Sequence, residues 1–303
     1  MIVVVCLNPA LDVTHQLDAV RWGGVNRPRA VHARPGGKGL NVARALHALG
    51  ADVLVLGLAG GITGAGVEAS LRGLGVPAAF TPLTGETRRT FSVVDDSRVT
   101  AFHEPGPEVG AAEFDKFRID YEKAQAGAQA VVLSGSLPPG LPAGTYATLI
   151  QAAGVPVVLD THGEALRRGA AAGPAVVKPN RAELEALTGR SLTTGEEVTA
   201  AAGELRGARA VVITLGPGGL LAATGDGCWR ARVPAAVAGN ATGAGDAVAA
   251  ALAHGIILGR PWDERLRHAA ALGAATAAAP VAGEFCQQDY LDALRVVAVE
   301  EVR

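Results

Sequence analysis

A short loop with two glycines runs into an alanine-rich segment at residues 240–252, where the sequence reads Asn-Ala-Thr-Gly-Ala-Gly-Asp-Ala-Val-Ala-Ala-Ala-Leu. This pattern predicts a glycine loop followed by a buried helix. The first N–H groups of a helix have no intrahelical partners and carry partial positive charge, so they attract an anion such as phosphate. Gly243 and Gly245 lack a Cβ and leave room for such an anion beside the N–H groups of residues 243–245. Asp246 falls in the first turn, where its carboxylate can take a proton from a hydroxyl group while the anion is held.

The same loop and aspartate, found in isolation, are also typical of a tight turn that only stabilises a helix start. The rest of the chain therefore has to decide between a structural and a catalytic interpretation of Asp246.

The composition describes a globular protein with a sizeable core. Of its 303 residues, 49% are hydrophobic and 18% are charged, which excludes a disordered chain. The formal net charge of −2 argues against general binding to nucleic acid or to an anionic membrane. Cys6, Cys228 and Cys286 are scattered and do not form the pairs that a cysteine zinc site or a disulfide scaffold needs. With no signal-like N-terminus and no apolar run long enough to span a membrane, we expect a cytoplasmic protein.

Short apolar segments alternate with predicted helices through most of the chain. The apolar segments, which we expect to form buried strands, lie at residues 2–7, 52–59, 130–133, 155–159, 175–178 and 210–214. Helices are expected at residues 65–74, 111–126, 143–153, 181–187 and 195–206 and after the glycine loop, with a hairpin at 220–233. This alternation predicts an α/β fold in which a mostly parallel sheet is covered on both faces. Ligands bind at the carboxyl ends of strands in such sheets, and the glycine, serine and aspartate motifs of this chain fall there.

Two segments, at about residues 9–34 and 85–106, do not fit the buried parallel pattern. Their strands are less apolar, and residues 95–97 (Asp-Asp-Ser) are typical of a hairpin turn. We expect these segments to form a small β-sheet lid, inserted at one edge of the core, that carries Asp12, Arg27 and Arg88. The whole chain, residues 1–303, is then a single unit made of this lid and a core that contains the remainder.

Residues 19–51 contain no acidic residue, although the chain as a whole is slightly acidic. The basic residues of this stretch are Arg21, Arg27, Arg29, Arg34, Lys38 and Arg44. Such a local excess of positive charge predicts a docking place for an anion. Residues 34–46 of this stretch form a glycine turn that leads into a helix. The turn is not a Walker A loop, because neither Ser nor Thr follows Lys38.

Five sequence blocks, in this order, resemble the PfkB (ribokinase-like) family of sugar kinases. The blocks lie at residues 8–12 (Asn-Pro-Ala-Leu-Asp), 36–44 (Gly-Gly-Lys-Gly-Leu-Asn-Val-Ala-Arg), 134–140 (Ser-Gly-Ser-Leu-Pro-Pro-Gly), 178–184 (Lys-Pro-Asn-Arg-Ala-Glu-Leu) and 242–247 (Thr-Gly-Ala-Gly-Asp-Ala). The resemblance extends from about residue 7 to residue 283 and is strongest to the 1-phosphofructokinase and tagatose-6-phosphate kinase branch. It implies a ribokinase-like three-layer α/β/α core with a small β-sheet lid, and it implies ATP and Mg²⁺ as cofactors.

The resemblance also implies roles for the residues that match the family's acceptor site. Asp246 matches the catalytic base, and the N–H groups of Gly243, Ala244 and Gly245 match an anion hole for the transferred phosphoryl group. The positions that match sugar-binding residues are Asp12, Gly37 and Asn41. The residues expected near a phosphate already on the sugar are Lys38, Arg27, Arg88 and Ser136. For Asp12, Asn41 and Ser136 taken singly, structural roles in a turn or a helix are the alternatives.

A second group of matching residues implies a nucleotide and its metal ion. Asn180 and Glu183 match the Asn-X-X-Glu motif that positions Mg²⁺ through water, although Asn180 alone is also typical of a helix cap. The residues expected at the nucleotide phosphates are Lys178, Thr214, Gly216 and Gly219. Residues 278–283 match part of the adenine pocket in position but lack the more polar ending of many relatives. Asp160 follows a predicted strand, and we interpret it as a helix cap.

The expected activity is ATP- and Mg²⁺-dependent phosphorylation of a phosphorylated ketohexose, with fructose 1-phosphate converted to fructose 1,6-bisphosphate. Tagatose 6-phosphate is the alternative substrate, and a sugar-phosphate-binding regulator without catalysis is an alternative function. A nicotinamide-dependent oxidoreductase is disfavoured, because Val248 replaces the third glycine of its motif and Asp246 would repel a pyrophosphate. We expect no nucleic-acid or membrane partner. We do expect a homodimer, because lid sheets with exposed edges often pair.

Overall fold

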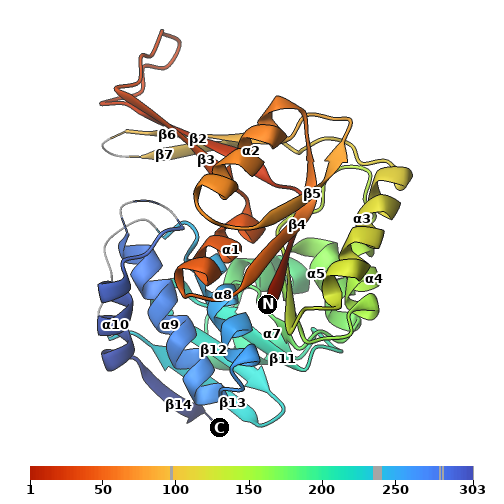
Figure 1. Cartoon of the computed structure of the whole chain (residues 1–303). Coiled ribbons are helices and arrows are strands. Elements are labelled where there is room, and N and C mark those ends of the chain that lie inside the picture. The colour runs from red at the N-terminus through yellow and green to blue at the C-terminus, as the bar shows by residue number, and fades with distance from the viewer. Residues whose placement is uncertain (96–97, 235–240, 280, 282, 303) are drawn as a thin grey trace.

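A ten-stranded sheet forms the centre of the computed structural model, which describes residues 1–95, 98–234, 241–279, 281 and 283–302 (Figure 1). The strand order is β14-β13-β12-β11-β10-β9-β8-β1-β4-β5. The parallel strands are β1 (Ile2–Cys6), β4 (Val53–Gly60), β5 (Ala78–Leu83), β8 (Ala130–Ser134), β9 (Val157–Asp160), β10 (Val176–Val177) and β11 (Ala210–Thr214). The strands that extend one edge antiparallel are β12 (Leu220–Thr224), β13 (Gly227–Arg232) and β14 (Ala298–Val302).

Helices cover both faces of this sheet. The helices packed on one face are α1 (Lys38–Ala48), α2 (Gly61–Gly73), α8 (Ala244–Ile257), α9 (Trp262–Ala278) and α10 (Gln287–Val296). Those on the other face are α3 (Ala111–Gln125), α4 (Thr145–Ala152), α5 (Gly163–Ala171), α6 (Arg181–Thr188) and α7 (Gly195–Ala202). Alternate residues of the central strand β1 enter the two hydrophobic clusters, which is why its sequence is apolar throughout. The predicted three-layer α/β/α fold is confirmed.

A second sheet of four strands, here called the lid sheet, stands beside the core in the order β3-β2-β6-β7 (Figure 1). Its strands are β2 (Ala10–Gln16), β3 (Ala30–Gly36), β6 (Arg88–Val94) and β7 (Val99–His103). Residues of one face, among them Thr14, His32 and Ser92, line a large cavity. The opposite face carries Val31 and Phe102, which are 55% and 56% exposed. The small second sheet of the predicted fold class is therefore also present.

Some elements differ from the pattern expected from the sequence. Strand β14 has the sequence Ala-Val-Glu-Glu-Val and is largely exposed at the sheet edge, so it lacks the apolar run by which buried strands are recognised. Helix α7 ends at Ala202, with Gly203 as its C-cap, rather than near residue 206. Residues 96 and 97 of the expected hairpin turn, and residue 240 of the glycine loop, lie outside the described residues. In the part of the chain that the structure describes, no helix is both long and apolar enough to cross a membrane.

Candidate active site

A cavity of about 1620 Å³ lies between the lid sheet and the carboxyl ends of the core strands. Segments that follow β1, β8, β10 and β11 contribute to its wall, together with the N-terminal ends of α1 and α8. Pockets for one small molecule usually measure about 300–1,000 Å³, so this volume has room for two ligands side by side. The position agrees with the rule that open α/β sheets bind ligands beyond the carboxyl ends of their strands.

The glycine loop brings the start of α8 to this cavity. Gly243 is the N-cap of α8 and has φ +88°, a left-handed conformation that glycine adopts without strain. Residues 241–246 all line the cavity, and the N–H of Ala244 donates to the carbonyl of Ala241 at 3.2 Å, as in a tight turn. The positive end of α8 therefore faces the cavity, which suits an anion there.

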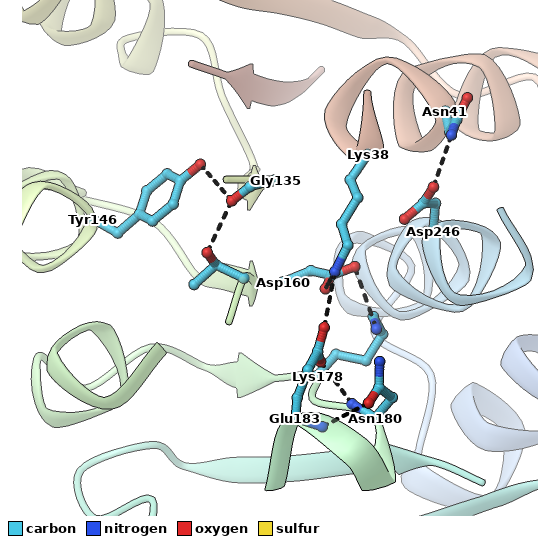
Figure 2. A network of polar contacts seen from close by, with 10 residues as sticks. Lys38, Asn41, Gly135, Tyr146, Asp160, Lys178, Asn180, Glu183 and Asp246 are labelled. Atoms are coloured by element: carbon cyan, nitrogen blue, oxygen red, sulfur yellow. Dashed lines mark hydrogen bonds and ion pairs between the residues drawn. The ribbon is translucent and has the colours of Figure 1, made fainter. Parts of the chain in front are cut away.

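Asp246 is only 6% exposed, although it lines the cavity. Asn41 donates a hydrogen bond from Nδ2 to Asp246 Oδ2 at 2.9 Å (Figure 2). Burial, together with the nearby carboxylate of Asp160, raises the pKa of Asp246 to about 7, against the lowering effects of Asn41, Lys38 and Lys178. A carboxylate with a pKa near neutral can both accept and release a proton at physiological pH.

Helix α1 positions the residues opposite Asp246. Gly37 is the N-cap of α1 with φ +101°, and both Gly37 and Asn41 line the cavity. Arg44, one turn further on, donates from Nη1 to Asn41 Oδ1 at 3.4 Å. This contact orients the Asn41 amide so that its NH₂ group faces Asp246. The amide therefore stabilises the ionised form of Asp246.

Polar side chains lie on both sides of the cavity, on the lid sheet and in the segments after strands β1 and β8. Asp12 on β2 accepts a hydrogen bond from Thr90 Oγ1 on the neighbouring strand β6. A Cβ on Gly36 would collide with the Asp12 carboxylate, so glycine is required there to leave space for it. On the core side, Asn8 Nδ2 donates to Ser136 Oγ at 3.1 Å, which leaves the Ser136 hydroxyl hydrogen for another acceptor.

The basic residues of the lid take different positions. Arg88 lines the cavity and donates to the carbonyl of Asn8 at 3.1 Å and to that of Glu104 at 3.2 Å. Arg27, in contrast, is exposed on the connection between β2 and β3 and is not among the described residues that line the cavity. In Figure 1 this connection extends away from the body of the protein. In this structure of one chain, Arg27 does not reach the cavity. Its contact with a sugar phosphate therefore stays a prediction.

Arg34, which is not among the predicted site residues, also lines the cavity. It lies opposite Asp12 in the register of β2 and β3, and its buried Nη1 has no hydrogen-bond partner in the described part of the chain. The sequence signal for it is the run of basic residues around it. A buried guanidinium nitrogen without a partner is available to an anionic ligand.

Four charged residues meet at the floor of the cavity (Figure 2): Lys38 and Lys178 line it, and Asp160 and Glu183 contact them from outside its lining. Lys38 Nζ lies 3.1 Å from Asp160 Oδ1 and 3.2 Å from Glu183 Oε1. Lys178 Nζ lies 3.3 Å from Asp160 Oδ2, and Asp160 is fully buried. Burial lowers the pKa of Lys38, but the carboxylates of Asp160, Glu183 and Asp246 outweigh it and raise that pKa above its usual value.

The interpretation of Asp160 as a helix cap is wrong. The N-cap of the next helix, α5, is His162, whose side chain makes no capping hydrogen bond. Asp160 instead ends strand β9, and its carboxylate joins Lys38 to Lys178. The sequence alone does not indicate this role, because the partner Lys38 is 122 residues away along the chain.

The residues predicted to contact a nucleotide lie together on one side of the cavity. Lys178 and Thr214 lie at the ends of the neighbouring strands β10 and β11, and Asn180 forms a bridge to Thr214. Gly216 and Gly219 belong to the turn that follows, and all five residues line the cavity. A Cβ on Gly245 would lie 3.5 Å from Lys178 Nζ, which places the Lys178 ammonium beside the glycine loop.

Asn180 and Glu183 form a capping box at the start of α6. Asn180 Oδ1 accepts from the N–H of Glu183, and Glu183 Oε2 accepts from the N–H of Asn180, both at 2.8 Å. The helix-cap interpretation of Asn180 is thus confirmed, and Glu183 does not itself line the cavity. Its other carboxylate oxygen faces Lys38 and Asp160.

The floor residues fit a magnesium ion in charge and ligand type. Glu183 and Asp160 provide carboxylate oxygens around one cation, the Lys38 ammonium, and the buried Asp160 Oδ2 accepts no hydrogen bond from the described residues but lies 3.3 Å from the Lys178 ammonium. No group of three or more His, Cys, Asp or Glu residues gathers into a metal cage in the described part of the chain. Mg²⁺ is typically held by one or two carboxylates plus water and substrate phosphates, so two carboxylates are enough.

The loop after β8 is fixed by the hydroxyl groups of two buried residues. Tyr146 Oη and Thr161 Oγ1 both donate to the carbonyl of Gly135, at 3.1 and 2.9 Å (Figure 2). The N–H of Gly135 donates to the carbonyl of Asp160 at 2.9 Å. These bonds tie the position of Ser136 to that of the charged floor.

Gly283 brings the segment after α9 to the glycine loop. Its N–H donates to the carbonyl of Thr242 at 2.9 Å, and Val281 lines the cavity. Residues 280 and 282 of the expected adenine pocket lie outside the described residues.

Comparisons with known proteins agree with this architecture. Residues 6–288 match the pfkB family of carbohydrate kinases. The structure is similar to phosphofructokinase-2 from Escherichia coli, with a TM-score of 0.92 and 31% identity over 97% of this chain and 98% of that one. It is similar to a possible 1-phosphofructokinase from Thermotoga maritima, with a TM-score of 0.90 and 27% identity over 100% and 99%. The ribokinase of Arabidopsis thaliana shares the fold, with a TM-score of 0.78 and 23% identity over 97% and 98%.

Proposed function

The chain belongs to the pfkB family of carbohydrate kinases, and we propose that it phosphorylates a phosphorylated ketohexose, with fructose 1-phosphate as substrate and fructose 1,6-bisphosphate as product. As a member of this family it is a sugar kinase, which transfers a phosphoryl group to a hydroxyl group. The observation that carries the proposal is the position of Asp246. Its carboxylate is buried beside an anion-binding helix start and opens into a cavity whose other wall is basic.

Asp246 is the proposed general base. Its carboxylate takes the proton from the acceptor hydroxyl as that oxygen attacks the γ-phosphorus of ATP, and ADP leaves. Asn41 holds the carboxylate by the 2.9 Å hydrogen bond and so keeps one oxygen fixed while the other meets the substrate. Asp12, held by Thr90, is placed to accept hydrogen bonds from sugar hydroxyls.

The N–H groups of residues 243–245 are the proposed anion hole for the transferred phosphoryl group. Lys178, beside Gly245, is placed to neutralise charge on the nucleotide phosphates, with Thr214, Gly216 and Gly219 lining the same side. Asn180, Glu183 and Asp160 would hold Mg²⁺, which would offset the charge of the nucleotide phosphates when bound. Phosphoryl transfer needs mainly positioning and charge stabilisation, and these residues supply both.

The sugar phosphate is proposed to bind at the basic wall that Lys38 and Arg88 form, with the hydroxyl group of Ser136 as a further contact. The structural similarity to a possible 1-phosphofructokinase supports fructose 1-phosphate. Tagatose 6-phosphate is the alternative substrate within the same class. Fructose 6-phosphate also has to be compared, because the phosphofructokinase-2 of E. coli has been solved in complex with it.

The test is ADP release with fructose 1-phosphate, tagatose 6-phosphate, fructose 6-phosphate and free fructose, measured side by side with Mg²⁺ and ATP. The proposal expects the highest kcat/KM for fructose 1-phosphate and no turnover after chelation of the metal with EDTA. A higher kcat/KM for tagatose 6-phosphate or fructose 6-phosphate would change the substrate but keep the kinase. Binding of a sugar phosphate without ADP release from any of the four would favour the non-catalytic regulator.

The raised pKa of Asp246 predicts that activity falls in mild acid. The base works only when ionised, and its pKa is about 7, so kcat/KM is expected to rise with pH through this value and level off above it. The measurement is kcat/KM from pH 5.5 to 8.5, an interval of about three units around that pKa.

The Asn41→Ala variant separates this titration from that of the substrate phosphate, whose own second pKa is about 6. Asn41 lowers the pKa of Asp246, so its loss is expected to move the midpoint of the profile to higher pH. An unchanged midpoint in Asn41→Ala would assign the titration to another group. A flat wild-type profile would contradict a general base with a pKa of about 7.

Replacing Lys38 by alanine is expected to weaken the binding of phosphorylated sugars selectively. A hydrogen bond to a charged group contributes about 1.5–3 kcal/mol, so KM for fructose 1-phosphate is expected to rise about 10- to 100-fold. KM for free fructose is expected to change little, because that sugar has no phosphate for Lys38 to contact. An equal rise in both KM values would remove Lys38 from the phosphate site.

A homodimer that pairs through the lid sheet is part of the proposal. Strands β3 and β7 are the edges of that sheet, and one face of it exposes Val31 and Phe102. E. coli phosphofructokinase-2 has a tetrameric inhibited form, which supports oligomerisation of this chain too. Sedimentation of the wild type and of Phe102→Lys tests it: the variant is expected to shift toward the monomer.

A further inference from the structure

Lys38 occupies a position that its own helix disfavours. It is the first residue of α1, where the helix dipole opposes a positive charge, and no acidic residue lies in the first turn to offset it. The side chain reaches instead to strand β9 and helix α6, where its Nζ contacts Asp160 and Glu183 (Figure 2). Attraction to these two carboxylates therefore fixes the ammonium group.

The two carboxylates have separate second partners. Asp160 Oδ2 lies 3.3 Å from Lys178 Nζ, and Glu183 Oε2 accepts the N–H of Asn180. Among the described residues, Lys38 is the one cation that contacts both carboxylates. Its ammonium thus neutralises the same oxygen atoms that a divalent cation would need as ligands.

The Lys38 side chain is not fully enclosed at this position. It is 34% exposed, whereas that of Lys178 is 3% exposed. The four-carbon stem of lysine is flexible, and Lys38 lines the cavity together with Arg34 and Arg88, at the wall where a sugar phosphate is expected.

We propose that Lys38 holds Asp160 and Glu183 in the absence of sugar phosphate, and that a sugar phosphate draws the ammonium away and frees both carboxylates for a divalent cation. This inference rests on the proposed function, because it takes a phosphorylated sugar as the ligand. A phosphate competes with the carboxylates for the ammonium, and a divalent cation and an ammonium repel each other at the same oxygens. Binding of the sugar phosphate and of the cation is then coupled, and each tightens the other by the same factor.

Titration with Mn²⁺, followed by the EPR signal of the free ion, tests the coupling without turnover, because Mn²⁺ takes the same carboxylate and water ligands as Mg²⁺. In the wild type, saturating fructose 1-phosphate is expected to lower the Kd for Mn²⁺ about tenfold, and free fructose to leave it unchanged. In Lys38→Met, the Kd without sugar is expected to be about tenfold lower already, and fructose 1-phosphate to change it less than about twofold. Lys116→Met, which alters an exposed lysine of α3, is expected to match the wild type.

Two results would overturn the proposal. One is a Lys38→Met protein that binds Mn²⁺ no more tightly than the wild type in the absence of sugar. The other is a wild type that binds fructose 1-phosphate by calorimetry and yet keeps the same Kd for Mn²⁺. Failure of the wild type to bind any sugar phosphate would instead remove the proposed function, and the sugar-free comparison of Lys38→Met with the wild type still decides the role of Lys38. If Lys38→Met melts well below the wild type, Lys38→Gln replaces it in both comparisons.

Discussion

Asp246→Asn is expected to lower kcat about 10²- to 10⁴-fold while the protein still binds fructose 1-phosphate. Asparagine keeps the size of the side chain and its contact with Asn41, but it cannot accept the proton of the acceptor hydroxyl. The anion hole at residues 243–245 and the basic wall are unchanged, so binding of the sugar phosphate is retained. The measurements are kcat from ADP release and the sugar-phosphate Kd from calorimetry, on the same preparation.

A matched control for this variant is Asp289→Asn. Asp289 also lies in the first turn of a helix, α10, but it is exposed and lies outside the cavity. If Asp246 only stabilised a helix start, the two variants would lose similar, small amounts of stability and both would stay active. If Asp246→Asn were nearly as active as Asp289→Asn, Asp246 would not be the general base.

Asp160→Asn is expected to lower the free energy of unfolding by about 3 kcal/mol, because it leaves the buried Lys178 ammonium without its ion-pair partner. Lys178 is only 2% exposed, and Asp160 is its one ion-pair partner among the described residues. Removing one member of a buried pair costs far more than removing one of an exposed pair. The measurement is urea unfolding monitored by circular dichroism.

Asp292→Asn provides the comparison for that experiment. Asp292 pairs with Arg295 on the surface of α10, and both side chains are more than half exposed, at 54% and 74%. Its loss is expected to change the free energy of unfolding by less than about 1 kcal/mol. Equal effects of Asp160→Asn and Asp292→Asn would show that the floor of the cavity tolerates an unpaired Lys178 and would contradict this prediction.

The sequence predicts well those elements whose local pattern of apolar and polar residues is compatible with only one secondary structure. Strand β1 is apolar at every position because it is buried on both faces, and it was recognisable as a strand for that reason. Strand β14, with two glutamates and an exposed face, carries no such pattern, and only its pairing with β13 makes it a strand. Its partner is about 70 residues away in the sequence, so no local rule could find it.

The site divides in the same way. The glycine loop and Asp246 are local: the loop, the helix start and the carboxylate lie within a few residues, and their common position at the cavity could be inferred from the motif. Asp160 could not, because its role depends on Lys38 and Lys178 from two other elements. Arg34 belongs to a basic run from which the resemblance picks Arg27 and Lys38 instead. Only the register with Asp12 and the unpartnered nitrogen single out Arg34.

Asn180 shows a different limit. The sequence supports both a helix cap and a metal site, and the structure has the cap, with both hydrogen bonds of the capping box formed. The cap leaves Glu183 Oε1 turned toward Asp160 and Lys38. One motif can therefore serve both purposes, since the cap orients the carboxylate whose other oxygen, here paired with Lys38, is proposed to meet the metal ion.

A crystal structure of the protein with fructose 1-phosphate and a non-hydrolysable ATP analogue tests the central claim most directly. We expect a carboxylate oxygen of Asp246 about 2.6–3.2 Å from the acceptor hydroxyl, with the γ-phosphate at the N–H groups of residues 243–245. A complex in which the acceptor hydroxyl meets another side chain, while Asp246 stays bonded to Asn41 alone, would contradict this claim.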